Sequence, residues 1–192
     1  MKSVPWLVLF ASVGMSVGNA AEPPGPKRQI AQAVLAAPEA ERDTCTVLGY
    51  DADGKVVTLR AGGNNFVCIA DDPKRPGFAV ACYEKDLEPF MARGRELREA
   101  GKSEKQIWDT REAEVKSGAL TIPDKSILFV LTGTENPATG DVTETYLRYV
   151  IYIPFATSES TGIPTAPTGP GGPWIMDGGT FHAHIMINPP RG

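Results

Sequence analysis

Apolar side chains recur at helical spacing near the start of the chain, in residues 27–37. Ile30, Val34 and Ala37 share one face of a helix with this sequence. Pro38 ends the pattern, because the residue before a proline is driven out of the helical region. We expect a short helix here, which either packs against the rest of the chain or forms a loosely held tail.

A longer helical pattern follows in two parts, residues 86–100 and 103–116. Asp86 is a candidate N-cap of the first part, and the spacing of Ser103 and Gln106 is that of a capping box at the start of the second. The apolar stripes consist of Leu87, Phe90, Met91, Gly94 and Leu97, then Ile107, Trp108 and Val115. Two helices joined by a short turn predict a helical hairpin.

Three arginines of the first helix, Arg93, Arg95 and Arg98, could gather to bind an anion. Glu96 and Glu99 are interleaved with them at helical spacing. Ion pairs between neighbouring turns stabilise such a face. We therefore favour a solvated, ion-paired helix surface over an anion site.

Alternating and continuous apolar runs predict strands on both sides of the helices. The expected strands are 44–50, 55–60, 66–70 and 78–83 before the helices, and 126–132, 143–155 and 181–188 after them. Asp51-Ala-Asp-Gly54 between the first two could suggest calcium, but Gly49 and Arg60 stand where further acidic ligands belong, so a hairpin turn is favoured. Strands flanking an inserted helical hairpin predict an α+β fold with antiparallel β-sheets from both halves of the chain.

The first residues carry the three-part pattern of a secretory signal peptide. Lys2 precedes an apolar run that is too short to span a bilayer, and small residues follow up to Ala20. We expect a signal peptide at 1–20, a linker and short helix at 21–43, and a single α+β domain at 44–192. No later segment is apolar for long enough to span a membrane, so a protein that is periplasmic or secreted is predicted.

The net charge limits the class of partner, and the cysteine content indicates which disulfide forms. Nineteen Lys and Arg against 23 Asp and Glu give a formal charge of −4, which argues against nucleic acid and favours a small molecule or a protein as partner. In an oxidising compartment two of the three cysteines should pair. If Cys45 lies two strands from Cys68, it is beyond disulfide reach. Cys68–Cys82 is then the expected disulfide, with Cys45 free and buried.

Both histidines of the protein lie in one C-terminal stretch, residues 171–188. On an alternating strand, His182, His184 and Met186 would share one face, and two imidazoles at that spacing can share a metal. Asp177 is the nearest third ligand, or a carboxylate that orients an imidazole. Such a set suits copper or zinc. The alternative is an exposed His182 and a half-buried, structural His184.

Two further interpretations use the same region. General-base or nucleophilic catalysis would have to recruit His182 or His184, with a carboxylate from Glu144, Glu159 or Asp177, yet no catalytic motif joins them, and the catalytic residues stay unassigned. Ligand recognition without chemistry could use the aromatic residues beside the long 156–173 loop, which are Tyr146, Tyr149, Tyr152 and Trp174. The alternative is a purely structural role, with these rings in the core and rim of the sheet.

Four blocks of the sequence resemble a group of exported bacterial proteins of about 200 residues. They are VLGYDADGKVVTLRAG, VACYEKDLEPFMARGRELR, YVIYIPFATSEST and PWIMDGGTFHAHIMI, and they extend over nearly the whole mature chain. The resemblance implies a complete exported protein of bacterial type, and it implies no activity, cofactor or site. We therefore expect a non-catalytic exported protein that binds a small ligand or partner near Trp174, Tyr152, His182 and His184. The alternative is a metal-binding protein or metal-dependent enzyme that uses the two histidines.

Overall fold

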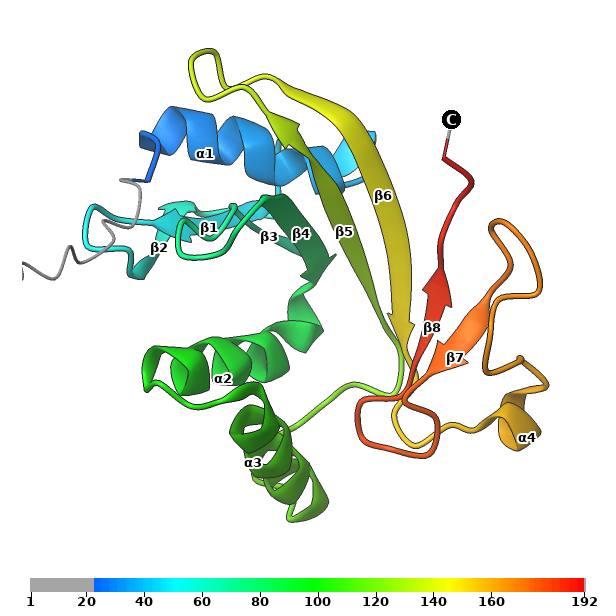
Figure 1. Cartoon of the computed structure of the whole chain (residues 1–192). Coiled ribbons are helices and arrows are strands. Elements are labelled where there is room, and N and C mark those ends of the chain that lie inside the picture. The colour runs from blue at the N-terminus through cyan, green and yellow to red at the C-terminus, as the bar shows by residue number, and fades with distance from the viewer. Residues whose placement is uncertain (1–22, 192) are drawn as a thin grey trace, which may run out of the picture.

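The computed structural model describes residues 23–191, and the expected signal peptide at 1–20 lies outside them. A single eight-stranded sheet, mostly antiparallel, has the order β2-β1-β3-β4-β5-β6-β8-β7, with helices on both faces (Figure 1). The strands are β1 (Thr46–Tyr50), β2 (Val56–Arg60), β3 (Phe66–Ile69), β4 (Phe78–Glu84), β5 (Ser126–Glu135), β6 (Val142–Tyr152), β7 (Trp174–Met176) and β8 (His184–Ile187). The expected mixture of antiparallel strands and helices is confirmed, with one continuous sheet rather than several.

The N-terminal strands are not arranged in the order of the sequence. β1 pairs with β2 in an antiparallel hairpin, whose turn is closed by the carboxylate of Asp51, and it also pairs with β3 in parallel. The connector after β2 crosses the start of β1, where the amide of Gly63 donates to the carbonyl of Thr44 at 2.8 Å. A Cβ on Gly62 would lie 2.2 Å from the backbone of Cys45, so this close crossing requires a residue without a side chain.

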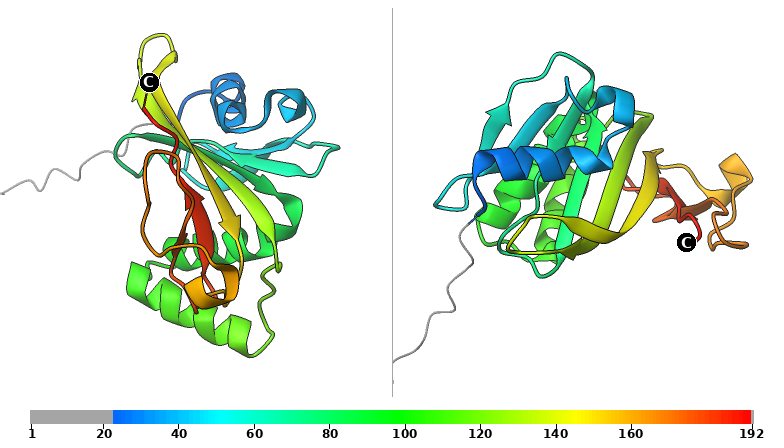
Figure 2. Two further views of the ribbon diagram at one scale, coloured as in Figure 1. Left: turned by 90° about the vertical axis from the view of Figure 1, so that its right-hand side faces the viewer. Right: turned by 90° about the horizontal axis from the view of Figure 1, so that it is seen from above.

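The helix α1 (Pro26–Ala33) covers one face of the sheet, as the view from above shows (Figure 2). It continues into a 3₁₀ turn, Val34–Ala36, and both Ala33 and Ala36 are fully buried against strands β3 to β5. Of the two expectations for this segment, packing against the sheet is therefore the correct one. Small residues at these positions let the helix approach the sheet closely.

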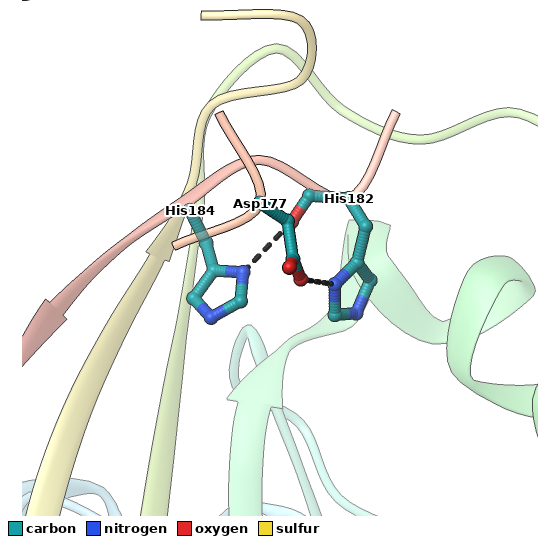
Figure 3. Close-up of side chains that lie close together, drawn as sticks. All are labelled: Asp177, His182 and His184. Carbon is teal, nitrogen blue, oxygen red and sulfur yellow. Dashed lines mark hydrogen bonds and ion pairs between the residues drawn. The ribbon is translucent and has the colours of Figure 1, made fainter. Parts of the chain in front are cut away.

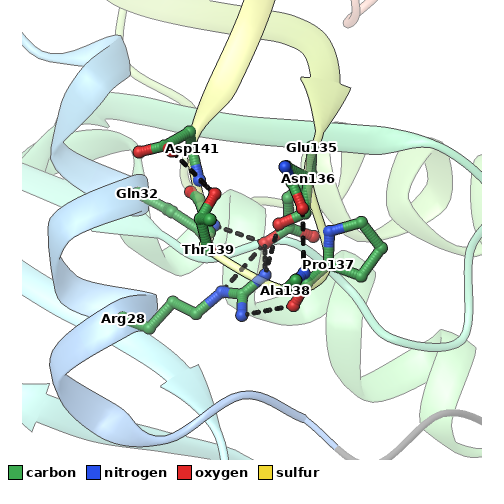
Figure 4. Close-up of polar contacts among 9 residues, drawn as sticks. Arg28, Gln32, Glu135, Asn136, Pro137, Ala138, Thr139 and Asp141 are labelled. Atoms are coloured by element: carbon green, nitrogen blue, oxygen red, sulfur yellow. Dashed lines mark hydrogen bonds and ion pairs between the residues drawn. The ribbon is translucent and has the colours of Figure 1, made fainter.

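The turn between β5 and β6 holds α1 through polar contacts (Figure 4). The carboxylate of Glu135 accepts from the guanidinium of Arg28 at 2.7 Å and from the amide of Gln32, and Arg28 also donates to the carbonyl of Pro137 at 2.8 Å. Arg28 and Glu135 are about three-quarters buried, with exposed side-chain fractions of 28% and 25%. Solvent therefore screens this ion pair less than a pair on the open surface.

Replacing Glu135 by alanine should lower the free energy of unfolding by about 1–3 kcal/mol, because it leaves two donors without their acceptor. The loss should be local, so the amides of α1 should exchange with deuterium faster, while those of β4 and β5 stay protected. Glu159→Ala, at an exposed carboxylate, is the control. Unchanged exchange in α1 would show that the apolar contacts alone hold this helix.

Two consecutive helices, α2 (Glu88–Glu99) and α3 (Glu104–Lys116), pack against each other and cover the opposite face of the sheet. Ser103 and Gln106 form the expected capping box. Asp86 does not cap α2: a 3₁₀ turn, Lys85–Leu87, precedes the helix, and the Asp86 carboxylate accepts from the Ser126 hydroxyl at 2.8 Å instead. None of the helices in residues 23–191 combines the length and the apolar character needed to cross a membrane.

The cysteines lie together beneath α1. Cys68 and Cys82 are directly opposite each other on β3 and β4, at disulfide distance, which confirms the expected pair. The argument that excluded Cys45 was wrong, because β1 is the direct neighbour of β3. The sulfur of Cys45 lies 3.4 Å from that of Cys68, and Cys45 is free and fully buried.

Candidate functional site

Both histidines lie at the end of a tight connection between the last two strands. β7 ends at Met176, and β8 begins only at His184, so the strand expected at 181–188 is shorter than predicted. His182 lies in the turn before the strand, and the strict alternation that placed it beside His184 and Met186 does not apply. The two imidazoles nevertheless come together, with their ring centroids 5.0 Å apart.

Backbone hydrogen bonds fix this connection to the end of β6. The amide of Phe155 donates to the carbonyl of Thr180 at 2.7 Å, and that of Gly179 donates to Ala156 at 2.8 Å. Asp177 itself has a φ of +56°, a left-handed conformation that is uncommon for a residue with a side chain. The hydroxyl of Thr180 donates to the carbonyl of Asp177 at 2.7 Å and so helps to hold this conformation.

Asp177, His182 and His184 form the core of the site (Figure 3). Each of the three offers one ligand atom, and these atoms all lie within 4.8 Å of one another. The Nδ1 atom of His182 is 2.8 Å from a carboxylate oxygen of Asp177, and the Nδ1 atom of His184 is 2.7 Å from the carbonyl oxygen of His182. His184 is only 5% exposed, whereas a third of the Asp177 side chain reaches solvent.

These hydrogen bonds determine which ring nitrogens keep a free lone pair. A carbonyl oxygen can only accept, so Nδ1 of His184 carries a proton, and in the neutral tautomer with this proton the lone pair is on Nε2. Nδ1–H of His182 likewise donates a hydrogen bond to the carboxylate of Asp177. Burial lowers the pKa of His182, which keeps the ring neutral at neutral pH although Asp177 acts in the opposite direction. The hydrogen bonds therefore favour the same neutral tautomer in both rings, with Nε2 as the acceptor.

Aromatic rings from three elements enclose His182. Trp108 of α3 and Tyr152 of β6 lie edge-to-face with it, at centroid distances of 5.2 and 5.5 Å, and Phe90 of α2 lies at 6.1 Å. The Tyr152 hydroxyl is 3.4 Å from Nε2 of His182, and burial raises the pKa of Tyr152 to about 12, so this hydroxyl stays protonated. The alternative of an exposed His182 is wrong, and so is that of a half-buried His184, which is almost completely buried.

The two methionines near the site have different surroundings. Met186, a predicted ligand, shares the face of His184 on β8 but packs against the buried cluster that contains Tyr152 and Phe181. Met176 is the direct cross-strand partner of His184 and is 40% exposed. Side chains at directly opposed positions lie on the same face of a sheet about 5 Å apart. Met176 was not among the predicted residues, and its position two residues before the Gly178-Gly179 turn is the signal that would have found it.

The predicted aromatic surface is divided among separate places. Tyr152 belongs to the histidine site, whereas Tyr146 and Tyr149 line a hollow of about 710 Å³ with residues 189–191. Trp174 starts the edge strand β7 opposite Met186, and its indole N–H is buried without a hydrogen-bond partner among the described residues.

Of the residues considered for catalysis, only some lie near the histidines. Cys45 lies under α1, on the face of the sheet opposite to the histidines, so a Cys–His pair does not form. The carboxylate that reaches an imidazole is Asp177, and neither Glu144 nor Glu159 does so within residues 23–191. The arrangement can hold a neutral imidazole with a defined tautomer, and can offer two nitrogens and an oxygen to a cation.

The chain matches no protein-family model, no curated protein and no solved structure.

Proposed function

We propose that the protein is an exported, periplasmic metal-binding protein that holds one zinc or copper ion through Asp177, His182 and His184. The observation that carries this proposal is the convergence of their three ligand atoms within 4.8 Å. Around a tetrahedral zinc, with bonds of about 2.0–2.2 Å, neighbouring ligand atoms are about 3.3 Å apart. To become a third ligand, the Asp177 carboxylate would have to leave Nδ1 of His182 and turn towards the ion.

The surroundings of the three residues support a transition metal over calcium or magnesium. Two neutral imidazoles are nitrogen ligands, which zinc and copper prefer. The hydrogen bonds at both Nδ1 atoms leave Nε2 as the nitrogen that can bind an ion, with the Tyr152 hydroxyl 3.4 Å from Nε2 of His182. Asp177 serves either as the third ligand or, through its present contact, as the carboxylate that fixes His182. A thioether from Met176 or Met186 would shift the preference towards copper.

Localisation and the helical pair complete the proposal. The signal-peptide pattern at 1–20 and the pairing of Cys68 with Cys82 support an oxidising compartment outside the cytoplasm. In this proposal, α2 and α3 form the inserted helical hairpin that the sequence predicts. Its role is to supply Phe90 and Trp108, which exclude water from one side of His182.

Isothermal titration of the metal-free protein with zinc and with copper tests the proposal. We expect one bound ion per chain and, at about 100 times the dissociation constant, an increase in stability of about 2.7 kcal/mol. His184→Gln should abolish stoichiometric binding. Asp177→Asn, at a partly exposed position that leaves the fold intact, should weaken it about 10- to 100-fold. Asp124→Asn, an exposed carboxylate, is the matched control.

Equal affinity in the wild type and the Asp177 variant, or no binding of either ion, would refute the metal site. A second candidate would then be favoured, which is direct recognition of a small ligand or a partner at Trp174. The specific observation in its support is the buried, unpaired indole N–H. Among residues 23–191, Phe155 and Met176 are the large hydrophobic residues that are exposed, at 49% and 40%, and both lie beside the 177–180 turn that follows β7.

A further inference from the structure

A cavity lined by charged residues lies between the sheet and the helices α2 and α3, away from the histidines. This half-open cavity of about 430 Å³ is lined by strands β3 to β6 and the 71–77 loop on one side and by α2 and α3 on the other. It shares Tyr50 and Arg95 with an adjoining hollow of about 370 Å³. Volumes of this size are in the range of small-molecule sites.

Arginine dominates the lining of this cavity. The charged residues around it are Arg75, Arg95, Arg98, Arg111 and Arg148, against Asp71 and Asp72. Arg95 is neutralised by Glu88, at 2.5 Å, and Arg98 reaches Glu104 at 3.4 Å. The ion-paired helix face expected from the sequence is therefore present, but it accounts for only part of the cluster.

Arg111 and Arg148 are the two arginines of this lining whose Nε atoms are buried without a partner. Neither forms an ion pair within residues 23–191, and the Nε atom of each is buried with no hydrogen-bond acceptor. Arg111 makes a 3.3 Å contact to the carbonyl of Phe90 and lies over that ring at 3.9 Å. Burial also lowers the pKa of Arg111. A buried N–H of a cationic group is costly to leave without an acceptor, so an anion that pairs with these two guanidinium groups would be favoured in this cavity.

We infer that this cavity binds a small organic anion, with Arg111 and Arg148 as the groups that hold its carboxylate or phosphate. The planar guanidinium matches both oxyanions through paired N–H donors. Tyr50 and Met91, on the walls, supply apolar surface for the rest of the molecule. The ligand is therefore an anionic head on an apolar body.

This anion site is separate from the histidine site. One face of β6 carries Arg148, Val150 and Tyr152, since every second residue of a strand points the same way. Arg148 and Tyr152 are therefore about 13 Å apart along the strand. Phe90 lies between the two sites, with Arg111 over its ring and His182 at 6.1 Å. The inference does not depend on metal binding, and His184→Gln should leave anion binding intact.

Titration with phenyl phosphate, benzoate and inorganic phosphate, followed by NMR at an ionic strength of about 0.15 M, tests the inference. We expect saturable one-to-one binding of phenyl phosphate or benzoate that is stronger than that of inorganic phosphate. The preferred head group identifies the natural anion as a phosphate or a carboxylate. Arg111→Met and Arg148→Met should each weaken binding about 10- to 100-fold.

The stability of the same variants separates a binding role from a structural one. Methionine keeps most of the length of the arginine side chain and removes an unpaired buried charge, so both variants should be at least as stable as the wild type. Lys105→Met removes one exposed charge outside the cavity and controls for net charge. Failure of all three probes to saturate, or equal affinity in the arginine variants and the control, would overturn the inference.

Discussion

Replacing Phe90 by alanine should lower the free energy of unfolding by about 3–5 kcal/mol, one of the two largest effects that we expect in this protein. Phe90 is fully buried at the centre of the aromatic cluster, with Tyr152 at 5.8 Å and Phe181 at 6.0 Å between ring centroids. Its removal would leave a cavity that these rigid rings cannot collapse to fill. Urea unfolding of the metal-free protein measures the loss.

The same substitution should also impair both proposed sites. The Phe90 ring contacts His182 on one side and the guanidinium of Arg111 on the other. Metal affinity and anion affinity should therefore fall together in Phe90→Ala, while Phe90→Leu should retain much of each. Phe155→Ala, at a half-exposed ring, should change stability by about 0.5 kcal/mol or less. A loss below about 1 kcal/mol in Phe90→Ala would contradict the tight packing of Phe90 between these rings.

Local sequence patterns predicted the elements better than their arrangement. The capping box at Ser103 and the turn at Asp51 were predicted correctly because each depends on residues that are close in sequence. The prediction of the strands beside β1 was wrong, because the glycine- and asparagine-rich connector 61–65 is typical of a hairpin turn between adjacent antiparallel strands. Instead, the connector crosses the start of β1 at Gly62, where there is no room for a side chain, and β3 then pairs with β1 in parallel.

The candidate metal ligands were predictable, whereas their surroundings were not. Asp177, His182 and His184 are separated by at most seven residues, so one turn brings them together. Two of the aromatic rings around His182, Phe90 and Trp108, come more than 70 residues before it in the sequence, and no local pattern predicts contacts at that separation. Arg148 did leave a signal, because it is the one charged residue in an otherwise apolar and aromatic segment of β6.

The other large effect that we expect is a loss of stability when the disulfide is removed. Its size should depend on which of the two cysteines is replaced. In Cys68→Ala, no disulfide remains, and stability should fall by about 2–5 kcal/mol. In Cys82→Ala, the sulfur of Cys45 lies 3.4 Å from the remaining Cys68 sulfur. Oxidative refolding with glutathione should then form Cys45–Cys68 and recover most of the loss.

The physical reason for this recovery is that the alternative disulfide also crosses neighbouring strands. It would close a loop of 23 residues in place of 14, and loop-closure entropy favours the longer loop slightly. Alkylation after unfolding, followed by mass spectrometry, should count no free thiol in Cys82→Ala and two in Cys68→Ala. Cys45→Ala should keep the native disulfide and have no free thiol. Two free thiols and an equal loss of stability in Cys82→Ala would mean that Cys45 cannot reach its neighbour, because the fully buried β1–β3 contact is too rigid to allow the bond.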